Sequence, residues 1–376
     1  MAHNVLKSKK GLFYMFTARE NMRRCIKNEG PDRYVNQYEA LKLLITPLSF
    51  HNPRPKRGEP DMVNAWGVTY SYPLNVPAGF PVHTPEKIVV KDIENWKDYV
   101  KAPKFDWPQE EWDRVKAMYD AVDRSKAYAC TFIAPGIFEQ THHLCSIDQA
   151  LLYYMINEDE MSELIKYITE WELEYARLIC EKLHPDAMLH HDDWGSETNS
   201  FLRPEMFDDY FLEPYKQIYG YYKDHGVEII VHHSDSYGAN IVPEMIEMGI
   251  DVWQGPMHTN PLPELVKKYG DKITFMGYID NKFVDFVQAT QDDCVKAARR
   301  CIEEVGTKEG FIPCITQGGP GSLFIGAYEG LWQAIDEYNT EKFGFTQEEL
   351  DAARYPLKPV MMAGTYEANI HNKYTD

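Results

Sequence analysis

The sequence predicts an α/β fold of the (β/α)8 TIM-barrel type with an irregular N-terminal extension. From residue 157 onward, short apolar segments alternate with segments of helical periodicity across brief connections, which is the pattern of parallel strands joined by helices. Polar side chains also follow strand after strand. A barrel gathers such strand ends around one mouth, whereas an open doubly wound sheet gathers them at a switch point. We expect an extension of helix and loops over residues 1–75, packed on a barrel over residues 76–376, as a single domain overall.

The hydrophobic content is sufficient for one large core, and the net charge argues against polyanionic partners. The chain has 376 residues, 44% of them hydrophobic, and a net charge of -19, so nucleic acid and anionic membranes are not expected partners. No apolar run is long enough for a transmembrane helix, and Met1–Gly11 lacks the apolar segment of a secretory signal. Seven cysteines are scattered without a Cys-x-x-Cys pair, which favours reduced thiols and a cytoplasmic location.

The extension is expected to contain one helix, over Thr17–Asn28. Pro47–Tyr72 is rich in Pro, Gly and Asn and is expected to form loops of the extension or a cap over the barrel mouth. A long helix then begins at Asn157, where Glu160 suits a capping box, and it ends at His184 because a proline follows.

Five strands alternate with helices after this point. Pro204 suits the first turn of the next helix, and Thr290 caps a later helix that Gly306 closes. The strands are expected over Asp186–Leu189, Val227–Val231, Ile250–Trp253, Ile273–Met276 and Phe311–Pro313. No Gly-rich nucleotide-binding motif follows any of them, so a dinucleotide-binding fold lacks support.

The strand that ends at Val231 runs directly into His-His-Ser-Asp. Alternate side chains of a strand share a face, so His233 and Asp235 are expected to point the same way. An imidazole and a carboxylate on one face bind a divalent metal or form an acid–base pair. A hydrogen-bonded pair that only orders a loop is an equal alternative.

The preceding strand runs into a second polar cluster, His190–Trp194. Two consecutive carboxylates repel each other unless a cation, a metal or a raised pKa offsets the repulsion. Acidic residues placed at a helix N-terminus are the alternative. Because the next strand carries a similar cluster, we favour a site, with Asp192, Asp193 and His191 as catalytic candidates and Trp194 as a substrate-binding candidate.

Later strand ends add further candidates. Cys314 precedes a Gly-rich turn, and a sulfur ligand together with imidazole favours zinc, although a buried core thiol is the commoner role of such a residue. The remaining substrate-binding candidates are His142, with His143 and Glu139 beside it, and Gln254, Tyr278 and Gln317.

Several of these motifs resemble the uroporphyrinogen decarboxylase superfamily, and most closely its branch of cobalamin-dependent methyltransferases. The motifs are Met15–Met22 with Gly30–Arg33, Asp192–Gly195, Pro204, Pro214-Tyr215, His225-Gly226, His233-x-Asp235, Gly249–Asp251 and Gly277–Asp280. They follow the order of that family over nearly the whole chain. The resemblance implies a (β/α)8 barrel with its site at the C-terminal mouth, and barrels that often pair as homodimers.

The resemblance also implies a reaction. True uroporphyrinogen decarboxylases carry an Arg-Gln-Ala-Gly-Arg-type segment, which Arg33–Glu39 does not reproduce. The methyltransferase branch binds zinc through a His-x-Cys motif and a later Cys. Here His233 matches the His, Asp235 replaces the first Cys, and Cys314 lies near the later Cys. With a carboxylate ligand, the zinc would act as a Lewis acid on an ether or alcohol oxygen.

We therefore expect a zinc-assisted methyltransferase component that moves a methyl group between a small methylated or methoxylated substrate and a corrinoid. The corrinoid would be carried by a separate partner protein, because no Asp-x-His-x-x-Gly segment occurs in this sequence. A metal-free lyase or decarboxylase on a small carboxylate substrate is the alternative, with Asp192 or Asp235 stabilising a protonated intermediate and His233 as proton donor. A binding protein without activity is a third, which two polar clusters after successive strands argue against.

Overall fold

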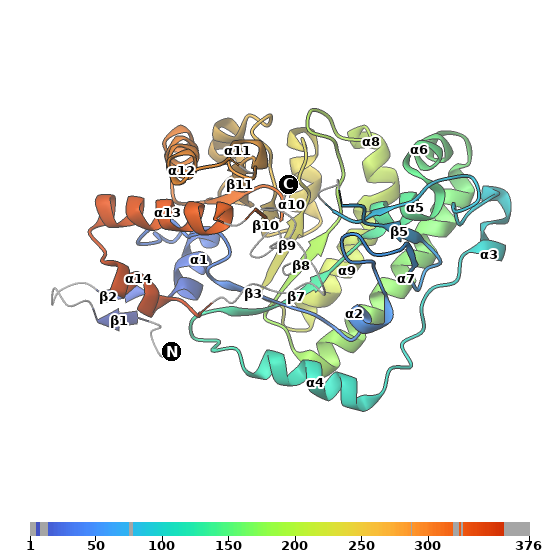
Figure 1. Ribbon diagram of the computed structural model, residues 1–376, viewed down its shortest axis with the longest axis horizontal. Coiled ribbons are helices and arrows are strands. Elements are labelled where there is room, and N and C mark those ends of the chain that lie inside the picture. The colour runs from blue at the N-terminus through green and yellow to red at the C-terminus, as the bar shows by residue number, and fades with distance from the viewer. Residues whose placement is uncertain are drawn as a thin grey trace.

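Seven parallel strands curl into the barrel at the centre of the molecule (Figure 1). The structure is a computed structural model and describes residues 5–7, 14–74, 78–286, 288–318, 323–324 and 326–356. Across the sheet the strands follow chain order: β3 (Leu41–Leu44), β7 (Tyr128–Ile133), β8 (Ala187–His191), β9 (Ile229–His233), β10 (Val252–Gln254), β11 (Thr274–Ile279) and β12 (Phe311–Ile315). Most of their residues are buried, as in parallel strands covered on both faces. The predicted barrel-type fold is confirmed.

Helices cover the outside of this sheet (Figure 1), with α11, α12 and α13 towards one side and α5 to α9 towards the other. Their bounds are α1 (Ala18–Lys27), α2 (Leu48–His51), α3 (Trp96–Tyr99), α4 (Gln109–Asp120), α5 (Ile137–Cys145), α6 (Ile147–Ile156), α7 (Glu158–Leu183), α8 (Pro204–Phe207), α9 (Glu213–Asp224), α10 (Val242–Glu247), α11 (Leu262–Tyr269), α12 (Gln291–Val305), α13 (Ala327–Phe343) and α14 (Gln347–Ala353). A π-helical turn (Asp208–Leu212) joins α8 to α9, and 3-10 turns lie at Ile93–Asn95, Ala239–Ile241 and Asn281–Phe283. Among the residues described, no helix has the length and apolarity needed to span a membrane.

Side chains that precede β3 connect the two edge strands of the sheet. The Ile315 amide of β12 donates to Gln37 Oε1 at 3.3 Å, and the Tyr38 hydroxyl donates to the Gly318 carbonyl at 3.4 Å. Helix α1 covers the beginning of β12, where Gly310 N donates to the Cys25 carbonyl at 3.0 Å. The curled sheet is thus closed between β12 and β3 by side chains and by α1.

The N-terminal region differs from the predicted extension in two ways. Strand β3 pairs in parallel with β7, so the barrel sheet begins inside the residues assigned to the extension. Pro47–Tyr72, predicted to be loops, contains α2 and contributes to a small antiparallel sheet of β4 (Met62–Val63), β5 (Thr69–Ser71) and β6 (Phe80–Pro81). Strands β1 (Val5–Lys7) and β2 (Tyr14–Phe16) form a hairpin. Strands of only two or three residues carry too little periodicity to be found in a sequence.

The predicted helix boundaries are mostly confirmed by the caps that the structure shows. Thr17 caps α1 by accepting from Glu20 N, and Asn28 caps its C-terminal end. Helix α12 has the predicted Thr290 capping box and ends at Gly306 in the left-handed region. Helix α7 begins after Asn157 as predicted, but the Asn157 side chain makes no capping hydrogen bond, so the capping box predicted there is wrong.

Candidate functional site

Strand alternation sends two adjacent pairs of histidines to opposite faces of the barrel wall. In the register of β8 and β9, His190 lies opposite His232 and His191 opposite His233. His190 and His232 face the outer helix layer, where both contact the Tyr219 hydroxyl of α9. Because successive side chains of a strand alternate, His191 and His233 face the barrel interior. Their rings stack there with centroids 4.4 Å apart.

Five side chains form what we call the histidine–carboxylate cluster: Glu139, His191, Asp193, His233 and Asp235. Glu139 comes from α5, and its Oε2 accepts from His191 Nδ1 at 2.8 Å. His233 Nε2 lies 3.8 Å from Asp193 Oδ1 and 3.8 Å from Asp235 Oδ2. The Asp235 amide donates to Asp193 Oδ1 at 3.0 Å, which holds the two carboxylates side by side. Three carboxylates and two imidazoles therefore meet at the carboxyl ends of β8 and β9.

The charges of this cluster do not balance unless it takes up protons or a cation. Burial and the neighbouring Asp193 raise the pKa of Asp235 above its ordinary value. Burial opposes protonation of His191, but the negative charges of Glu139 and Asp193 outweigh it and raise the pKa of His191 to about 10. Such strong shifts in one cavity are typical of functional sites. The electrostatics favour a positive charge at this position.

Gln254, predicted to contact substrate, instead fixes the hydrogen-bonding state of His233. Its Nε2 donates to the carbonyl oxygens of Ile315 and Thr316, at 3.0 and 3.3 Å. Its Oε1 is therefore the atom that faces His233 Nδ1 and must accept a proton from it. His233 therefore carries a proton on Nδ1, and Nε2 is the ring nitrogen that faces the two aspartates.

His191 is held in the same way by Glu139. With Nδ1 donating to that carboxylate, Nε2 is the remaining nitrogen. Metal-binding histidines in proteins almost always donate their other ring N–H to a carboxylate, a carbonyl or water. One ligand-capable atom from each of His191, Asp193 and His233 lies within 4.8 Å of the others. These three residues have the chemistry and the outer hydrogen bonds of a divalent metal site.

Asp192, predicted to be catalytic, is buried and caps α5. Its carboxylate accepts from Phe138 N at 3.0 Å, from Glu139 N at 2.7 Å and from Trp194 Nε1 at 2.9 Å, and it also accepts from the Tyr215 hydroxyl. Burial and the charge of Glu139 raise the pKa of Asp192 to about 7, against these hydrogen bonds. The structure thus places Asp192 beneath the cluster, where it positions Glu139.

Two predicted substrate-binding residues point away from the barrel mouth. Trp194 is buried and stacks on His232 with centroids 3.6 Å apart. Tyr278 has a positive φ of 73°, and its side chain interacts with Glu304 of α12. Burial and the charge of Glu304 raise the pKa of Tyr278 to about 12. Both aromatic side chains pack within the barrel wall.

Cys314 lies close to the cluster but outside its group of potential ligands. The thiol is fully buried beside Gln254 and Tyr38, and burial raises its pKa well above the ordinary value. Among the described residues, Cys314 belongs to no group of three ligand-capable side chains. Its role as a zinc ligand stays a prediction that substitution can test.

The last two predicted residues follow different strands of the barrel, β7 and β12. His142 is on α5, where burial and His83 lower its pKa to about 4. His142 forms a second group of potential ligands with Glu139 and His143. Gln317 is exposed after β12, and its backbone N–H donates to Asn281 Oδ1 at 3.0 Å.

The role of Glu139 was too weakly indicated by the sequence. Its side chain contacts His191 of the cluster, and it also belongs to the second group of potential ligands, with His142 and His143. The spacing Glu139-x-x-His142-His143 places three ligand-type side chains on one helix face, and that spacing could have indicated its importance. The hydrogen bonds that select one nitrogen of each histidine come from distant parts of the chain and leave no sequence pattern.

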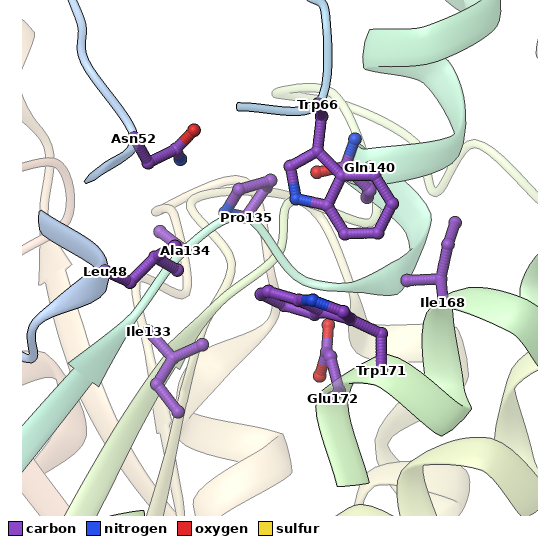
Figure 2. A pocket seen from close by; sticks show the side chains of 10 residues that line it. All are labelled: Leu48, Asn52, Trp66, Ile133, Ala134, Pro135, Gln140, Ile168, Trp171 and Glu172. Carbon is purple, nitrogen blue, oxygen red and sulfur yellow. The ribbon is translucent and has the colours of Figure 1, made fainter. Parts of the chain in front are cut away.

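A separate pocket lies outside the barrel wall, between β7, α5 and α7 (Figure 2). The residues that line it are Leu48, Asn52, Trp66, Ile133, Ala134, Pro135, Gln140, Ile168, Trp171 and Glu172. No member of the histidine–carboxylate cluster is among these described residues. The pocket and the cluster are thus on opposite faces of the wall.

Comparison with known proteins identifies the family. The family model for uroporphyrinogen decarboxylase (URO-D) matches residues 64–337, which is more than half of the chain and includes the whole cluster. The chain belongs to the uroporphyrinogen decarboxylase family. This URO-D family member also resembles the solved structure of a methyltransferase from Methanosarcina mazei, with a TM-score of 0.59 and 13% identity over 86% of this chain and 99% of that one. No curated protein sequence matches it.

Membership of the URO-D family confirms the resemblance that the sequence motifs indicated. At 13% identity the likeness to the methyltransferase shows a shared fold, and the reaction has to be argued from the site. Within this family member, β3 and α1 lie before the matched region and α14 lies after it.

Proposed function

We propose that this URO-D family member is a methyltransferase component that moves a methyl group between a small methylated or methoxylated substrate and a corrinoid protein, with the help of zinc. One observation carries the proposal: His191 and His233 each have Nδ1 engaged by an outer acceptor, which leaves Nε2 as their free nitrogen. A histidine pair prepared in this way beside Asp193 fits a metal better than it fits a simple acid–base pair.

The donor set supports a zinc ion. Imidazole nitrogens and carboxylate oxygens are ordinary zinc ligands. The 3.8 Å separation between His233 Nε2 and each aspartate oxygen exceeds the ordinary hydrogen-bond range of about 2.7–3.2 Å. His191, Asp193 and His233 would hold the ion, and Asp235 lies within reach as a fourth ligand. When bound, zinc would polarise a substrate oxygen and make the methyl–oxygen bond easier to break.

The remaining residues have defined tasks in this proposal. Glu139 and Gln254 orient the two histidines, and Asp192 positions Glu139 through the first turn of α5. Asp235 lies beside Asp193 and 3.8 Å from His233 Nε2, so it would complete the ligands of the ion. His142 stands at the edge of the cluster, where a small substrate would contact it.

The test is a transfer assay with the purified protein, zinc and reduced free cobalamin as the methyl acceptor. Methylated amines, thiols and methoxylated aromatic compounds are offered in turn, and the methylated corrinoid is followed by its visible spectrum. We expect turnover with at least one donor class and its loss in Asp193→Asn. If no donor class gives a methylated corrinoid while the zinc site is loaded, the methyltransferase proposal is wrong.

One observation favours a second candidate, a lyase or decarboxylase that works on a small carboxylate substrate. Without a metal, the raised pKa of His191, at about 10, makes this residue an imidazolium at neutral pH. A cation in the mouth would attract a carboxylate substrate and could supply a proton. Turnover of a carboxylate substrate to carbon dioxide by zinc-free protein would favour this candidate over the first.

A further inference from the structure

Behind the histidine–carboxylate cluster, a row of buried polar groups crosses the layer between the barrel wall and its helices. It begins at Glu172 of α7, whose Oε2 lies 3.4 Å from His190 Nε2. His190 Nδ1 is 3.1 Å from the Tyr219 hydroxyl, which is 2.8 Å from His232 Nδ1. His232 Nε2 is 3.1 Å from the backbone carbonyl of Asp192. The exposed fraction of all four side chains is 4% or less.

We propose that Glu172 is a positioning residue of the site: its protonated carboxyl group starts a one-way chain of hydrogen bonds that holds the Asp192–Asp193 peptide in place. Nothing in this inference depends on which reaction the site catalyses. It concerns side chains on the far face of the wall, none of which can touch a substrate in the barrel mouth.

The direction of this chain of hydrogen bonds follows from its last contact, between His232 Nε2 and the Asp192 carbonyl. The Asp192 carbonyl has no proton, so His232 Nε2 must be the donor there. A neutral His232 ring then accepts at Nδ1, so the Tyr219 hydroxyl donates to it and accepts from His190 Nδ1. Neutral rings are expected because both histidines are fully buried. His190 Nε2 is left as an acceptor that needs a proton donor.

Glu172 is the group that can satisfy this acceptor. His190 Nε2 accepts no hydrogen bond from any other group in the described part of the chain, and Glu172 Oε2 faces it at 3.4 Å. Figure 2 shows Glu172 on α7 beside the Trp171 ring at the pocket. None of the described residues that line the pocket is a lysine, an arginine or a histidine. Burial and the charge of Asp192 raise the pKa of Glu172 well above its ordinary value, which supports the protonated form.

The hydrogen-bond chain is connected to the histidine–carboxylate cluster through the backbone of Asp192 and Asp193. The carbonyl that accepts from His232 belongs to the peptide between Asp192 and Asp193. Asp192 caps α5 and thereby sets Glu139, while Asp193 lies 3.8 Å from His233 Nε2. A peptide fixed at its carbonyl oxygen cannot rotate freely, so both aspartates keep their places. Outer hydrogen bonds of this kind affect metal affinity by about 10–100-fold.

The test compares Glu172→Gln, whose amide can still donate to His190, with Glu172→Met, which has similar length and no donor. Glu170→Gln and Glu170→Met on the exposed face of the same helix are the matched controls. Nitrogen-15 NMR of histidine-labelled protein reports the tautomers of His190 and His232. Infrared difference spectra between wild type and Glu172→Gln report a protonated carboxyl group, and zinc titration reports the cluster.

We expect wild type and Glu172→Gln to show His190 protonated on Nδ1 and His232 protonated on Nε2, and wild type alone to show the carboxylic acid band of Glu172. Glu172→Met should lose the single tautomer pattern and bind zinc about tenfold or more weakly. An imidazolium at His190 beside an ionised Glu172 would overturn the proposal. So would a Met variant that matches the Gln variant in tautomers and zinc affinity. If Glu172→Met does not fold, the NMR and infrared spectra of wild type and Glu172→Gln still test the proposal. A wild type that binds no zinc would count against the proposed zinc site alone, because the NMR and infrared tests do not use the metal.

Discussion

Gln254 shows how a single uncharged residue can set the chemistry of a charged cluster. Two backbone carbonyls take its amide protons, so its oxygen must face His233 Nδ1. The imidazole proton is thereby held on the side away from the aspartates, and Nε2 stays available for a metal. Without this contact either nitrogen of His233 could carry the proton.

Replacing Gln254 by Leu should therefore weaken the metal site without removing any ligand. We expect zinc to bind about 10–100-fold more weakly, with the same stoichiometry when zinc is saturating, as measured by competition with a chelating dye. Gln317→Leu, an exposed position that does not contact His233, is the control and should leave the zinc affinity unchanged. Equal affinities in the two variants would show that Gln254 does not orient His233.

Glu172 gives a prediction about pH. Its pKa in the folded protein is raised well above the ordinary 4.5, so the proton it holds stabilises the fold fully below pH 4.5, and this contribution is lost as the pH rises towards the folded-state pKa. Relative to Glu172→Gln, which has no proton to lose, wild type should lose up to ~1.4 kcal/mol of unfolding free energy per pH unit above pH 4.5. Urea denaturation of both proteins from pH 4 to pH 8 measures the difference. A difference that stays constant with pH would mean that Glu172 is not protonated in the folded protein.

At the residue scale, the sequence indicated which strand ends meet but not every contact between them. His191, Asp193, His233 and Asp235 were predicted and do come together. Cys314 was grouped with them because of its place after the last strand, but its side chain is buried beside Gln254. Strand alternation is predictable, whereas the identity of the neighbour across the barrel depends on tertiary packing.

At the element scale, α5 depends on a residue from another part of the chain. Asp192 caps its first turn by accepting from Phe138 N and Glu139 N, and the absence of a side chain at Gly136 makes room for it. A Cβ atom at Gly136 would lie 2.5 Å from Asp192 Cβ. The end of β8 and the start of α5 are therefore fitted to each other, and Glu139 is placed as a result.

Gly136→Ala should disturb the cluster although it changes no ligand. Asp192 and the α5 N-terminus must move apart, so we expect a lower melting temperature and weaker zinc binding than in wild type. Gly220→Ala is the matched control, because a Cβ there meets nothing within 4 Å. Inside α9 it should stabilise the protein by about 0.5–1 kcal/mol. A Gly136→Ala variant as stable and as tight for zinc as wild type would show that the close approach to Asp192 has no consequence.

The elements themselves were largely predictable, and their ends were less so. Strands β8, β9, β11 and β12 all run two or three residues beyond the predicted ends. In β8 and β9 the added residues are histidines, which stay in the sheet. Polarity suggested loops there. The pairing of neighbouring strands explains the error, since it stabilises an extended backbone whatever the side chain is.

Across the whole molecule, buried ion pairs join the N-terminal region to the last helices beside the β3–β12 seam. The Arg354 guanidinium donates to both oxygens of Asp336, at 2.7 and 2.9 Å, and lies 3.1 Å from Glu39 Oε2. Arg33, itself buried, lies 3.8 Å from Glu39 on the other side. The charges are desolvated, so each depends on its partners.

Arg354→Met should be strongly destabilising. It leaves two buried carboxylates without their main cation, and removing one partner of a buried pair costs about 3–5 kcal/mol. Arg177→Met removes an exposed arginine that pairs with Glu174 and Glu181, and it should change the unfolding free energy by less than about 1 kcal/mol. Chemical denaturation of both variants makes the comparison, and equal small losses would mean that the network adds no stability.

At the scale of the whole molecule, the alternation of strands and helices in the sequence predicts the barrel. No pattern in the sequence predicts how the seam between β3 and β12 is closed. Arg33 was considered only for its place in the resemblance, whereas its partners come from the far end of the chain. Contacts between residues about 300 positions apart, such as Asn36 with Asp336, have no local sequence pattern.

The central claim is that His233 holds a metal at the barrel mouth. The most direct test is elemental analysis of protein purified without added metal or chelator, for wild type, His233→Ala and His225→Ala, which changes an exposed histidine outside the cluster. We predict about one zinc per chain in wild type and His225→Ala, and a loss of zinc in a folded His233→Ala. Folded wild-type protein that contains no metal and takes up none on titration would contradict the claim and favour the lyase.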